Sequence, residues 1–521
     1  MNFISKSKGT LGASILMLVP TSMMCMSCAA AAKTNAQKGQ QPNVIYIFPD
    51  QLRNYSLGFW NQGDNVSHLQ GAVSDPTNTP AIDSLASNSV VFSHAISNHP
   101  LSSPYRGMLL TGMYPYQNGI TTNCKRGRSE QLISEATCLT DVYSEAGYDV
   151  AYFGKCHWQE NEDLFDEEGN YKGTLTEPGG HNVNEFDTYV PGGIDRHHID
   201  YFYQLLSDQH MNPITYSNDP TNVNGKKDGE AYRPHRFSTK LESESIVRFL
   251  RNTHGQRQVN KPFFITWAIN PPHNPWTPAS TDMEFYPQYV ENGQPNFDKL
   301  LTRPNADAVA GKHAPYYYAN VSAVDHYIGD VLNELRKQGL MENTIVVFSS
   351  DHGEMLGSHH LEGKNYPFIE CYNIPWMIQW KGHLNHHIED MVMSAPDIMP
   401  TLLGLSGLKD KIPEEVMGTD YAELLTNPTS KSVARPTNAI YYGGHQRGVY
   451  NKQYMLVVVE KKGKFAEAYV YDNVNDPFQM KKLDPSKVDA TPELKKELVN
   501  LLKKTRDPWV KNKTCSDFLN Y

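Results

Sequence analysis

The feature that most constrains the fold of this chain is a set of short, nearly uninterrupted apolar runs. They lie at residues 44–48, 149–153, 263–268 and 344–348. Runs of this kind suit strands that are covered on both faces, and segments of helical pattern separate them. The sequence therefore predicts an α/β fold, with a doubly wound, mostly parallel sheet flanked by helices.

Polar side chains that could bind a ligand or take part in catalysis follow the ends of these runs. In an open α/β sheet the carboxyl ends of the strands form the edge where ligands bind. Asp50 could instead be a turn residue, and Lys155 a solvated lysine beside a hydrogen-bonded His157. If the backbone there is extended, Lys155 and His157 point to the same side. The candidates are Asp50, Gln51, Lys155, His157, His273, Asp351 and His352, with Lys364 further along the chain.

A second stretch combines a hydroxyl, a proline and an arginine at helical spacing. Pro104 is favoured in the first turn of a helix and Gly112 can end one, so Ser102 is expected just before the helix N-terminus. Free N–H groups and the helix dipole favour an anion there. Arg106, one turn on, carries a planar guanidinium suited to oxyanions. Taken alone, the stretch fits an ordinary surface helix equally well.

These elements together resemble the sulfatase family. In the family signature, Cys or Ser, any residue, Pro, any residue and Arg precede Leu-Thr-Gly, and Ser102, Pro104, Arg106 and residues 110–112 match it. The resemblance implies an alkaline-phosphatase-like fold and sulfuric ester hydrolysis. Further matching elements, in the same order, are Gly154-Lys155-Cys156-His157 (Cys replacing the usual Trp), Pro272-His273-Asn274-Pro275 and the run from Asp351-His352-Gly353-Glu354 to Lys364.

The resemblance also implies that Ser102 is a precursor. It would be oxidised after translation to formylglycine, whose hydrate carries two hydroxyls. One attacks sulfur and expels the sugar alcohol, and the other collapses to an aldehyde and releases sulfate. A serine rather than a cysteine at this position implies maturation by the bacterial anaerobic, radical-type enzyme.

The remaining site residues take their roles from the same resemblance. His157 accepts a proton from the hydrate or orients it, and His273 protonates the leaving alcohol. Three cations, Arg106, Lys155 and Lys364, neutralise the sulfuryl oxygens.

The expected metal ligands are Asp50, Gln51, Ser102, Asp351 and His352. The oxygen ligands suit Ca²⁺ or Mg²⁺ better than Zn²⁺. His352 adds a nitrogen where many family members have Asn. We expect Ca²⁺, with Mg²⁺ as the alternative.

The expected substrate is a sulfated carbohydrate, either a glycan or a glycosaminoglycan. A net charge of −10 argues against a nucleic-acid partner. Residues 158–237 are rich in loops, and the segment 195–201 is a candidate sugar contact or a plain surface loop. The alternatives are a phosphomonoesterase or phosphodiesterase of the same superfamily, which often binds two metals, and an inactive carbohydrate-binding relative in which Ser102 stays unmodified.

The N-terminus reads as an export signal covering residues 1–32, with a basic start, a short apolar stretch and small residues at its end. The protein is therefore expected to be periplasmic or secreted. Membrane contact is expected only if Cys25 or Cys28 carries a lipid. Five cysteines follow the signal, an odd and widely spaced set, in which Cys124 and Cys138 form the one pair considered for a disulfide.

The pattern changes in the last fifth of the chain. Short antiparallel strands are expected within 438–475, with Gly463 in a turn, followed by an amphipathic helix from Thr491. The predicted organisation is a catalytic α/β domain over 42–410 and a smaller sheet-and-helix subdomain over 411–521.

Overall fold

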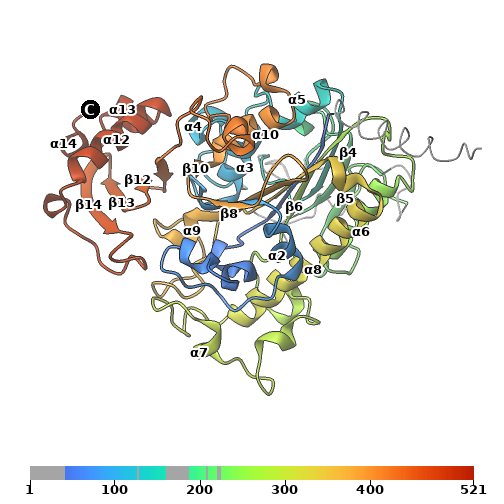
Figure 1. The fold of residues 1–521 in the computed structure, drawn as a ribbon, viewed down its shortest axis with the longest axis horizontal. Helices are drawn as coiled ribbons and strands as arrows, with labels where there is room; N and C mark the ends of the chain where they lie inside the picture. The colour runs from blue at the N-terminus through green and yellow to red at the C-terminus, as the bar shows by residue number, and fades with distance from the viewer. Residues whose placement is uncertain (1–40, 126–127, 160–186, 207–208, 220–224) are drawn as a thin grey trace, which may run out of the picture. The chain divides into compact units, whose positions relative to one another are not determined.

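The computed structural model describes residues 41–125, 128–159, 187–206, 209–219 and 225–521. The expected export signal lies outside them. A mixed ten-stranded sheet, ordered β10-β2-β8-β7-β1-β6-β3-β4-β5 with β9 beside β2, forms the centre (Figure 1). Its strands are β1 (Asn43–Pro49), β2 (Val90–Ile96), β3 (Asp149–Gly154), β4 (Tyr201–Leu205), β5 (Thr215–Ser217), β6 (Phe263–Ile269), β7 (Thr344–Ser349), β8 (Asn373–Trp380), β9 (His387–Glu389) and β10 (Met393–Ser394).

The four apolar runs form the middle of this sheet. β7, β1, β6 and β3 are neighbours in parallel register, which confirms the predicted α/β class. The antiparallel exceptions are β8, which pairs with both β2 and β7, and β5 beside β4. Parallel neighbours bring the carboxyl ends of all four central strands to one edge.

Helices cover both faces of the sheet, because alternate residues of β1 point to opposite sides. Val44, Tyr46 and Phe48 pack in one apolar cluster with α3, α5 and α10, whereas Ile45 and Ile47 pack in another with α2, α6 and α8. The helices of this part are α2 (Pro80–Ala86), α3 (Ser102–Thr111), α4 (Pro115–Asn118), α5 (Leu139–Glu145), α6 (Ser238–Arg251), α7 (Phe297–Leu300), α8 (Ala314–Lys337), α9 (Ile369–Tyr372), α10 (Ile398–Leu405) and α11 (Ala422–Thr426).

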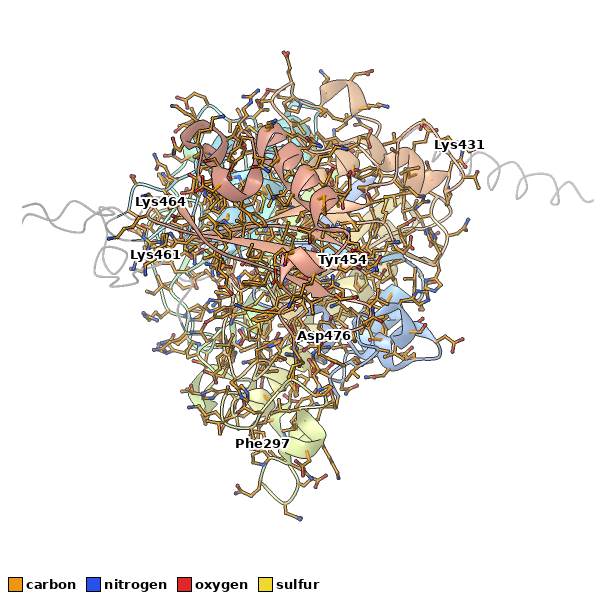
Figure 2. All side chains as sticks on the ribbon, turned by 90° about the vertical axis from the view of Figure 1, so that its left-hand side faces the viewer. Phe297, Lys431, Tyr454, Lys461, Lys464 and Asp476 are labelled. Atoms are coloured by element: carbon orange, nitrogen blue, oxygen red, sulfur yellow. The ribbon has the colours of Figure 1, made fainter. Side chains whose placement is uncertain are left out.

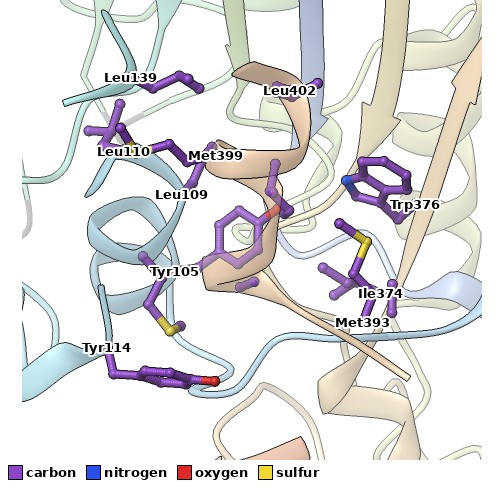
Figure 3. Close-up of a cluster of buried hydrophobic side chains, with 14 of the residues drawn as sticks. Tyr105, Leu109, Leu110, Tyr114, Leu139, Ile374, Trp376, Met393, Met399 and Leu402 are labelled. Atoms are coloured by element: carbon purple, nitrogen blue, oxygen red, sulfur yellow. The ribbon is translucent and has the colours of Figure 1, made fainter. Parts of the chain in front are cut away.

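Helix α3 is anchored by its apolar side. Tyr105 and Leu109 lie in one buried cluster with Met399 and Leu402 of α10 (Figure 3). The helix begins at Ser102, which is thus its first residue rather than the one before it. Because the helix is held along its length, the position of its first turn is fixed relative to the sheet edge.

A second, antiparallel sheet follows, in the order β11-β12-β13-β14. Lys461 and Lys464 face each other at the β13–β14 turn (Figure 2), where Gly463 takes a φ of 76° as expected. α12 buries Leu494, Leu498 and Leu502, and lies with α13 and α14 beside this sheet (Figure 1). The elements are β11 (Asn438–Tyr442), β12 (Gln446–Asn451), β13 (Tyr454–Lys461), β14 (Lys464–Asp472), α12 (Thr491–Lys504), α13 (Pro508–Asn512) and α14 (Ser516–Leu519).

Residues 42–521 form one compact unit. All five cysteines of the described part are free thiols, so the pairing considered for Cys124 and Cys138 is wrong for this structure. Within the described ranges, each helix is too short or too polar to cross a lipid bilayer.

Candidate active site

The carboxyl edge of the main sheet brings the predicted acids and the Ser102 hydroxyl together. Asp50 follows β1, Asp351 and His352 follow β7, and Ser102 opens α3. Ser102 Oγ lies 3.2 and 3.0 Å from the two carboxylate oxygens of Asp50 and 3.1 Å from His352 Nε2. All four side chains are fully buried, so the hydroxyl is held in a defined place.

Two cations converge on the same carboxylate. Lys155 Nζ donates to Asp50 Oδ2 over 2.7 Å, and Arg106 Nη2 donates to that oxygen over 3.1 Å. Although burial acts in the opposite direction, Lys155 and further cationic groups hold the pKa of Asp50 well below its ordinary value. The Asp50 carboxylate is therefore ionised, and it tethers two cations beside the hydroxyl.

A glycine allows Lys155 to reach this position. Gly154 ends β3 with a φ of 101°, and a Cβ there would lie 2.1 Å from the carbonyl oxygen of Ala268. The next residue, Lys155, donates its backbone N–H to the same carbonyl over 2.8 Å. Only a residue without a side chain permits this close approach of β3 to the end of β6.

The donor atoms of Asp50, Asp351 and His352 fit a divalent cation. They all lie within 4.8 Å of one another. Asp351 Oδ2 is buried and has no hydrogen-bond partner among the described residues. Burial and the nearby Asp50 charge raise the pKa of Asp351 to about 7. Arg106 Nη2 lies 3.6 Å from Asp351 Oδ2, beyond hydrogen-bond distance. A metal ion would relieve the repulsion between the acids and give Asp351 Oδ2 a direct ligand bond, since paired carboxylates suit a hard cation.

Gln51 connects this group to Lys364. Its side-chain oxygen accepts from Lys364 Nζ over 2.6 Å, and its backbone N–H donates to Asp351 Oδ1 over 2.9 Å. Its amide nitrogen donates to Glu354. Burial lowers the pKa of Lys364 to about 8, with Asp50 acting in the opposite direction. The structure thus places Gln51 and Lys364 beside the cluster of acids.

The two predicted histidines lie differently from each other. His157 has a φ of 55°, so the extended backbone expected after Lys155 is wrong, and Nε2 of His157 bonds to the carbonyl oxygen of Cys124 at 2.9 Å. Its buried Nδ1 has no partner within the described ranges. His273 is partly exposed, and its Nδ1 donates to Asn274 O over 2.6 Å. Desolvation of the ring by the surrounding protein, reinforced by the charge of Lys364, keeps the pKa of His273 well below its usual range.

A family model described as Sulfatase matches residues 42–408. The chain belongs to the sulfatase family. It is 37% identical over 517 residues to an endo-4-O-sulfatase of Bacteroides thetaiotaomicron, with 94% of this chain and 97% of the relative covered. An ulvan-active sulfatase of Formosa agariphila is 30% identical over 483 residues, covering 89% of this chain and 81% of the relative. The protein is therefore a sulfatase, a sulfuric ester hydrolase.

The fold of this sulfatase matches a solved structure of a Bacteroides thetaiotaomicron protein described with the metabolism of multiple glycosaminoglycans. The two superimpose with a TM-score of 0.85 at 36% identity, and the match covers 92% of this chain and all of the other. The alkaline-phosphatase-like architecture implied by the sequence motifs is confirmed.

Two buried side chains near the site were not among the predicted residues. Glu354 accepts hydrogen bonds from Gln51, from the backbone N–H of Leu356 at 3.0 Å and from that of Gly363. His210 donates from Nδ1 to a backbone carbonyl, and among the residues described its buried Nε2 has no partner. Glu354 belongs to the Asp351-His352-Gly353-Glu354 motif, so the sequence could have indicated it. His210 lies in the loop-rich region, and no sequence motif there indicates a functional residue.

The candidate sugar-contacting segment 195–201 is largely occupied with internal contacts. Arg196 is buried and pairs with Asp228 at 2.7 Å. His197 and His198 both approach the carboxylate of Asp141. Of these three side chains, only His198 is well exposed. These contacts commit Arg196, His197 and His198 to the protein itself, and whether the segment also contacts a sugar stays a prediction.

Proposed function

We propose that this sulfatase removes sulfate from a sulfated carbohydrate, with formylglycine formed from Ser102 as its nucleophile. The observation that carries the proposal is the environment of the Ser102 hydroxyl. It contacts Asp50 and His352, and the same carboxylate tethers Arg106 and Lys155. A nucleophile beside a group of candidate metal ligands and two cationic side chains suits attack on a tetrahedral oxyanion ester.

The cations would bind the sulfuryl oxygens during turnover. Arg106 and Lys155 bind Asp50, and Lys364 donates to Gln51, the next residue along the chain. In a buried site such charges stabilise the redistributed charge of the transition state much more than in water. Release from Asp50 toward the substrate would let Arg106 and Lys155 meet the sulfate directly.

The two histidines would handle protons. His157 is neutral, because burial and the charges of Lys155 and Arg106 push its pKa well below the ordinary value. It can therefore accept a proton from, or orient, a hydroxyl on residue 102. His273 lies at the partly exposed rim, which suits a group that meets the leaving alcohol. To act as an acid there, His273 must gain its proton when the anionic substrate binds.

Asp50, Gln51, residue 102, Asp351 and His352 would hold the metal, which we propose to be Ca²⁺, with Mg²⁺ as the alternative. Bound there, the ion would polarise a sulfate oxygen and help to hold the nucleophile. Neutral His352 and the Asp351 oxygen that lacks a hydrogen bond among the described residues are consistent with ligation. A two-metal phosphoryl hydrolase is less well supported, because one group of acid and histidine ligands surrounds Ser102 in the part of the chain that the structure describes.

The carbohydrate substrate is proposed from the relatives, whose names specify endo-4-O-sulfatase and ulvan-active sulfatase activities. An enzyme acting on such polymers must meet them outside the cytoplasm. We therefore also propose that the protein is exported through residues 1–32, to the periplasm or beyond, and that an anaerobic radical-type enzyme matures Ser102.

The proposal is tested by co-expression with and without that maturation enzyme. The peptide carrying residue 102 should lose two hydrogens in mass spectrometry, and only this form should release sulfate from sulfated oligosaccharides. Chelation should abolish turnover and Ca²⁺ should restore it. A peptide that remains unmodified after co-expression would overturn the formylglycine nucleophile. Faster hydrolysis of phosphate esters than of sulfated sugars would overturn the reaction class.

A further inference from the structure

A second group of metal-ligating side chains lies outside the site at Ser102. Cys138, Asp141 and His197 each offer one donor atom, and these atoms all lie within 4.8 Å of one another. All three residues are buried. We propose that Cys138 Sγ, an Asp141 carboxylate oxygen and His197 Nδ1 bind a Zn²⁺ ion, with a fourth position open to water.

The donor set selects this metal by its chemistry. One sulfur, one nitrogen and one oxygen are the ligands of four-coordinate zinc, whereas Ca²⁺ and Mg²⁺ take oxygen ligands. Binding would release the thiol proton of Cys138 to solvent and place the imidazole proton of His197 on Nε2. The thiolate and the carboxylate would then balance the two charges of the ion, so the buried complex is neutral.

The spacing of the nitrogen and oxygen donors also fits a tetrahedral ion. His197 Nδ1 lies 3.1 Å from Asp141 Oδ2. Ligands about 2.0–2.1 Å from zinc stand roughly 3.3 Å apart in a tetrahedron. Without an ion, His197 Nδ1 and Asp141 Oδ2 are hydrogen-bonded to each other, and Asp141 Oδ2 also accepts from the Cys138 backbone N–H at 2.8 Å. Cys138 Sγ accepts from the Asp141 backbone N–H, which completes a capping box at the start of α5. The nitrogen and oxygen donors therefore already stand close to the separation that zinc ligands take, and Cys138 Sγ lies within 4.8 Å of both.

His198 would support the site from outside. Its Nδ1 donates to the other carboxylate oxygen, Asp141 Oδ1, over 2.7 Å, and its side chain is 68% exposed. A hydrogen bond of this kind orients a ligating carboxylate and commonly changes metal affinity by about 10–100-fold. The exposed ring also marks the side from which an ion can enter.

A zinc ion here would join two segments that are far apart in sequence. Cys138 and Asp141 belong to the start of α5, and His197 follows the short turn before β4. Asp200, three residues on, is tied to β3 by a backbone bond to Val150 O at 2.9 Å. The ion would therefore fasten the loop before β4 to α5, independently of the proposed sulfatase mechanism.

The test is Co²⁺ binding to the chelator-treated full-length protein. Thiolate ligation produces a near-ultraviolet sulfur-to-cobalt charge-transfer band, and the donor group of described residues around Ser102 contains no sulfur. The wild type should show this band, and Zn²⁺ should abolish it by displacing Co²⁺. Cys138→Ser and His197→Gln should lose the band, whereas Cys515→Ser, which changes another buried free thiol, should keep it.

His198→Gln should keep the band but weaken Co²⁺ binding about 10–100-fold. Added Zn²⁺ should raise the melting temperature of the wild type and of Cys515→Ser, and leave that of Cys138→Ser and His197→Gln unchanged. Retained sulfatase activity in these variants shows that they fold. The proposal is overturned if the wild type shows no thiolate band, or if the band survives in Cys138→Ser; the group is then a hydrogen-bonded cluster only.

Discussion

Two regions of this sulfatase bury charged side chains, and they do so in opposite ways. In the C-terminal sheet, Arg447 donates from Nε to Asp507 over 2.7 Å. Its other two nitrogens donate to Gly443 O and to the Tyr116 hydroxyl, and the second Asp507 oxygen accepts from the Trp509 backbone N–H. Each nitrogen and oxygen of this ion pair has a partner, so the pair is closed.

The cluster at Ser102 is open by comparison. Arg106 Nε and Asp351 Oδ2 are buried without a hydrogen-bond partner in the described ranges. Ser102, Lys155 and Arg106 all donate to Asp50 Oδ2. Unused donors and acceptors are costly in a folded protein unless something else binds them. The difference indicates that the Arg447–Asp507 pair stabilises the fold, whereas the cluster at Ser102 has donors and acceptors left to bind an anion and a cation.

The largest expected effect is on turnover. Ser102→Ala removes the proposed nucleophile and should lower kcat by a factor on the order of 10⁵, with little change in melting temperature, because the open cluster does not hold the fold together. Ser103→Ala is the matched control: its hydroxyl accepts the Cys124 backbone N–H at 3.1 Å. Kinetics and thermal unfolding of both variants measure the contrast. A Ser102→Ala protein with near-normal turnover would contradict it.

The closed pair should give the reverse result. Asp507→Asn leaves Arg447 charged and buried, so the free energy of unfolding should fall by about 3–5 kcal/mol. Turnover per folded molecule should stay unchanged. Urea unfolding, with active-site titration at low temperature, separates the two quantities. If the variant had a lower kcat but the same free energy of unfolding, the conclusion that this ion pair stabilises the fold would be wrong.

Lys155→Met tests the open cluster from its cationic side. Loss of one cation at the sulfuryl oxygens should lower kcat/KM by about 10²–10³-fold. Asp50 keeps Arg106 as a partner, so the variant should be destabilised less than Asp507→Asn. Lys482→Met, which removes an exposed lysine from the surface pair with Glu467, is the control and should change neither quantity measurably. Equal losses in Lys155→Met and Lys482→Met would contradict the role of Lys155.

The sheet and the strand-end acids were predictable because their signals are local. The run before Asp50 and the run before Asp351 each determine a strand and its end, and parallel pairing then brings both acids to one edge. The signature around Ser102 and Arg106 is similarly contiguous. At these positions the local sequence pattern agrees with the global fold, and the sequence alone therefore predicts them.

Other features depend on contacts distant in sequence. The left-handed backbone of His157 accompanies a hydrogen bond to the carbonyl of Cys124, which no spacing rule encodes. The antiparallel placement of β8 between β2 and β7 depends on long-range pairing. His197 and His198 contact Asp141, which lies 56 and 57 residues earlier in the chain. Contacts of this kind can be identified only from the tertiary structure.

Glu242 provides the most specific test, because this buried carboxyl has no cationic partner among the residues that the structure describes. It accepts from Trp267 Nε1 over 2.7 Å, and burial raises its pKa to about 8 from 4.5. Between those values the folded protein holds a proton that the unfolded chain has lost. This group therefore makes stability fall as pH rises, by up to about 1.4 kcal/mol per pH unit.

Glu242→Gln keeps the acceptor for Trp267 and removes the titration. The variant should gain stability over the wild type steadily from pH 5 to pH 8, and the difference should level off above pH 8, where the folded wild type also ionises. Urea unfolding at several pH values measures the difference between the two proteins. A constant difference in the free energy of unfolding across this range would mean that Glu242 is already ionised in the folded protein. The protein would then tolerate a buried carboxylate without a cation, which would contradict the contrast between the open and closed clusters.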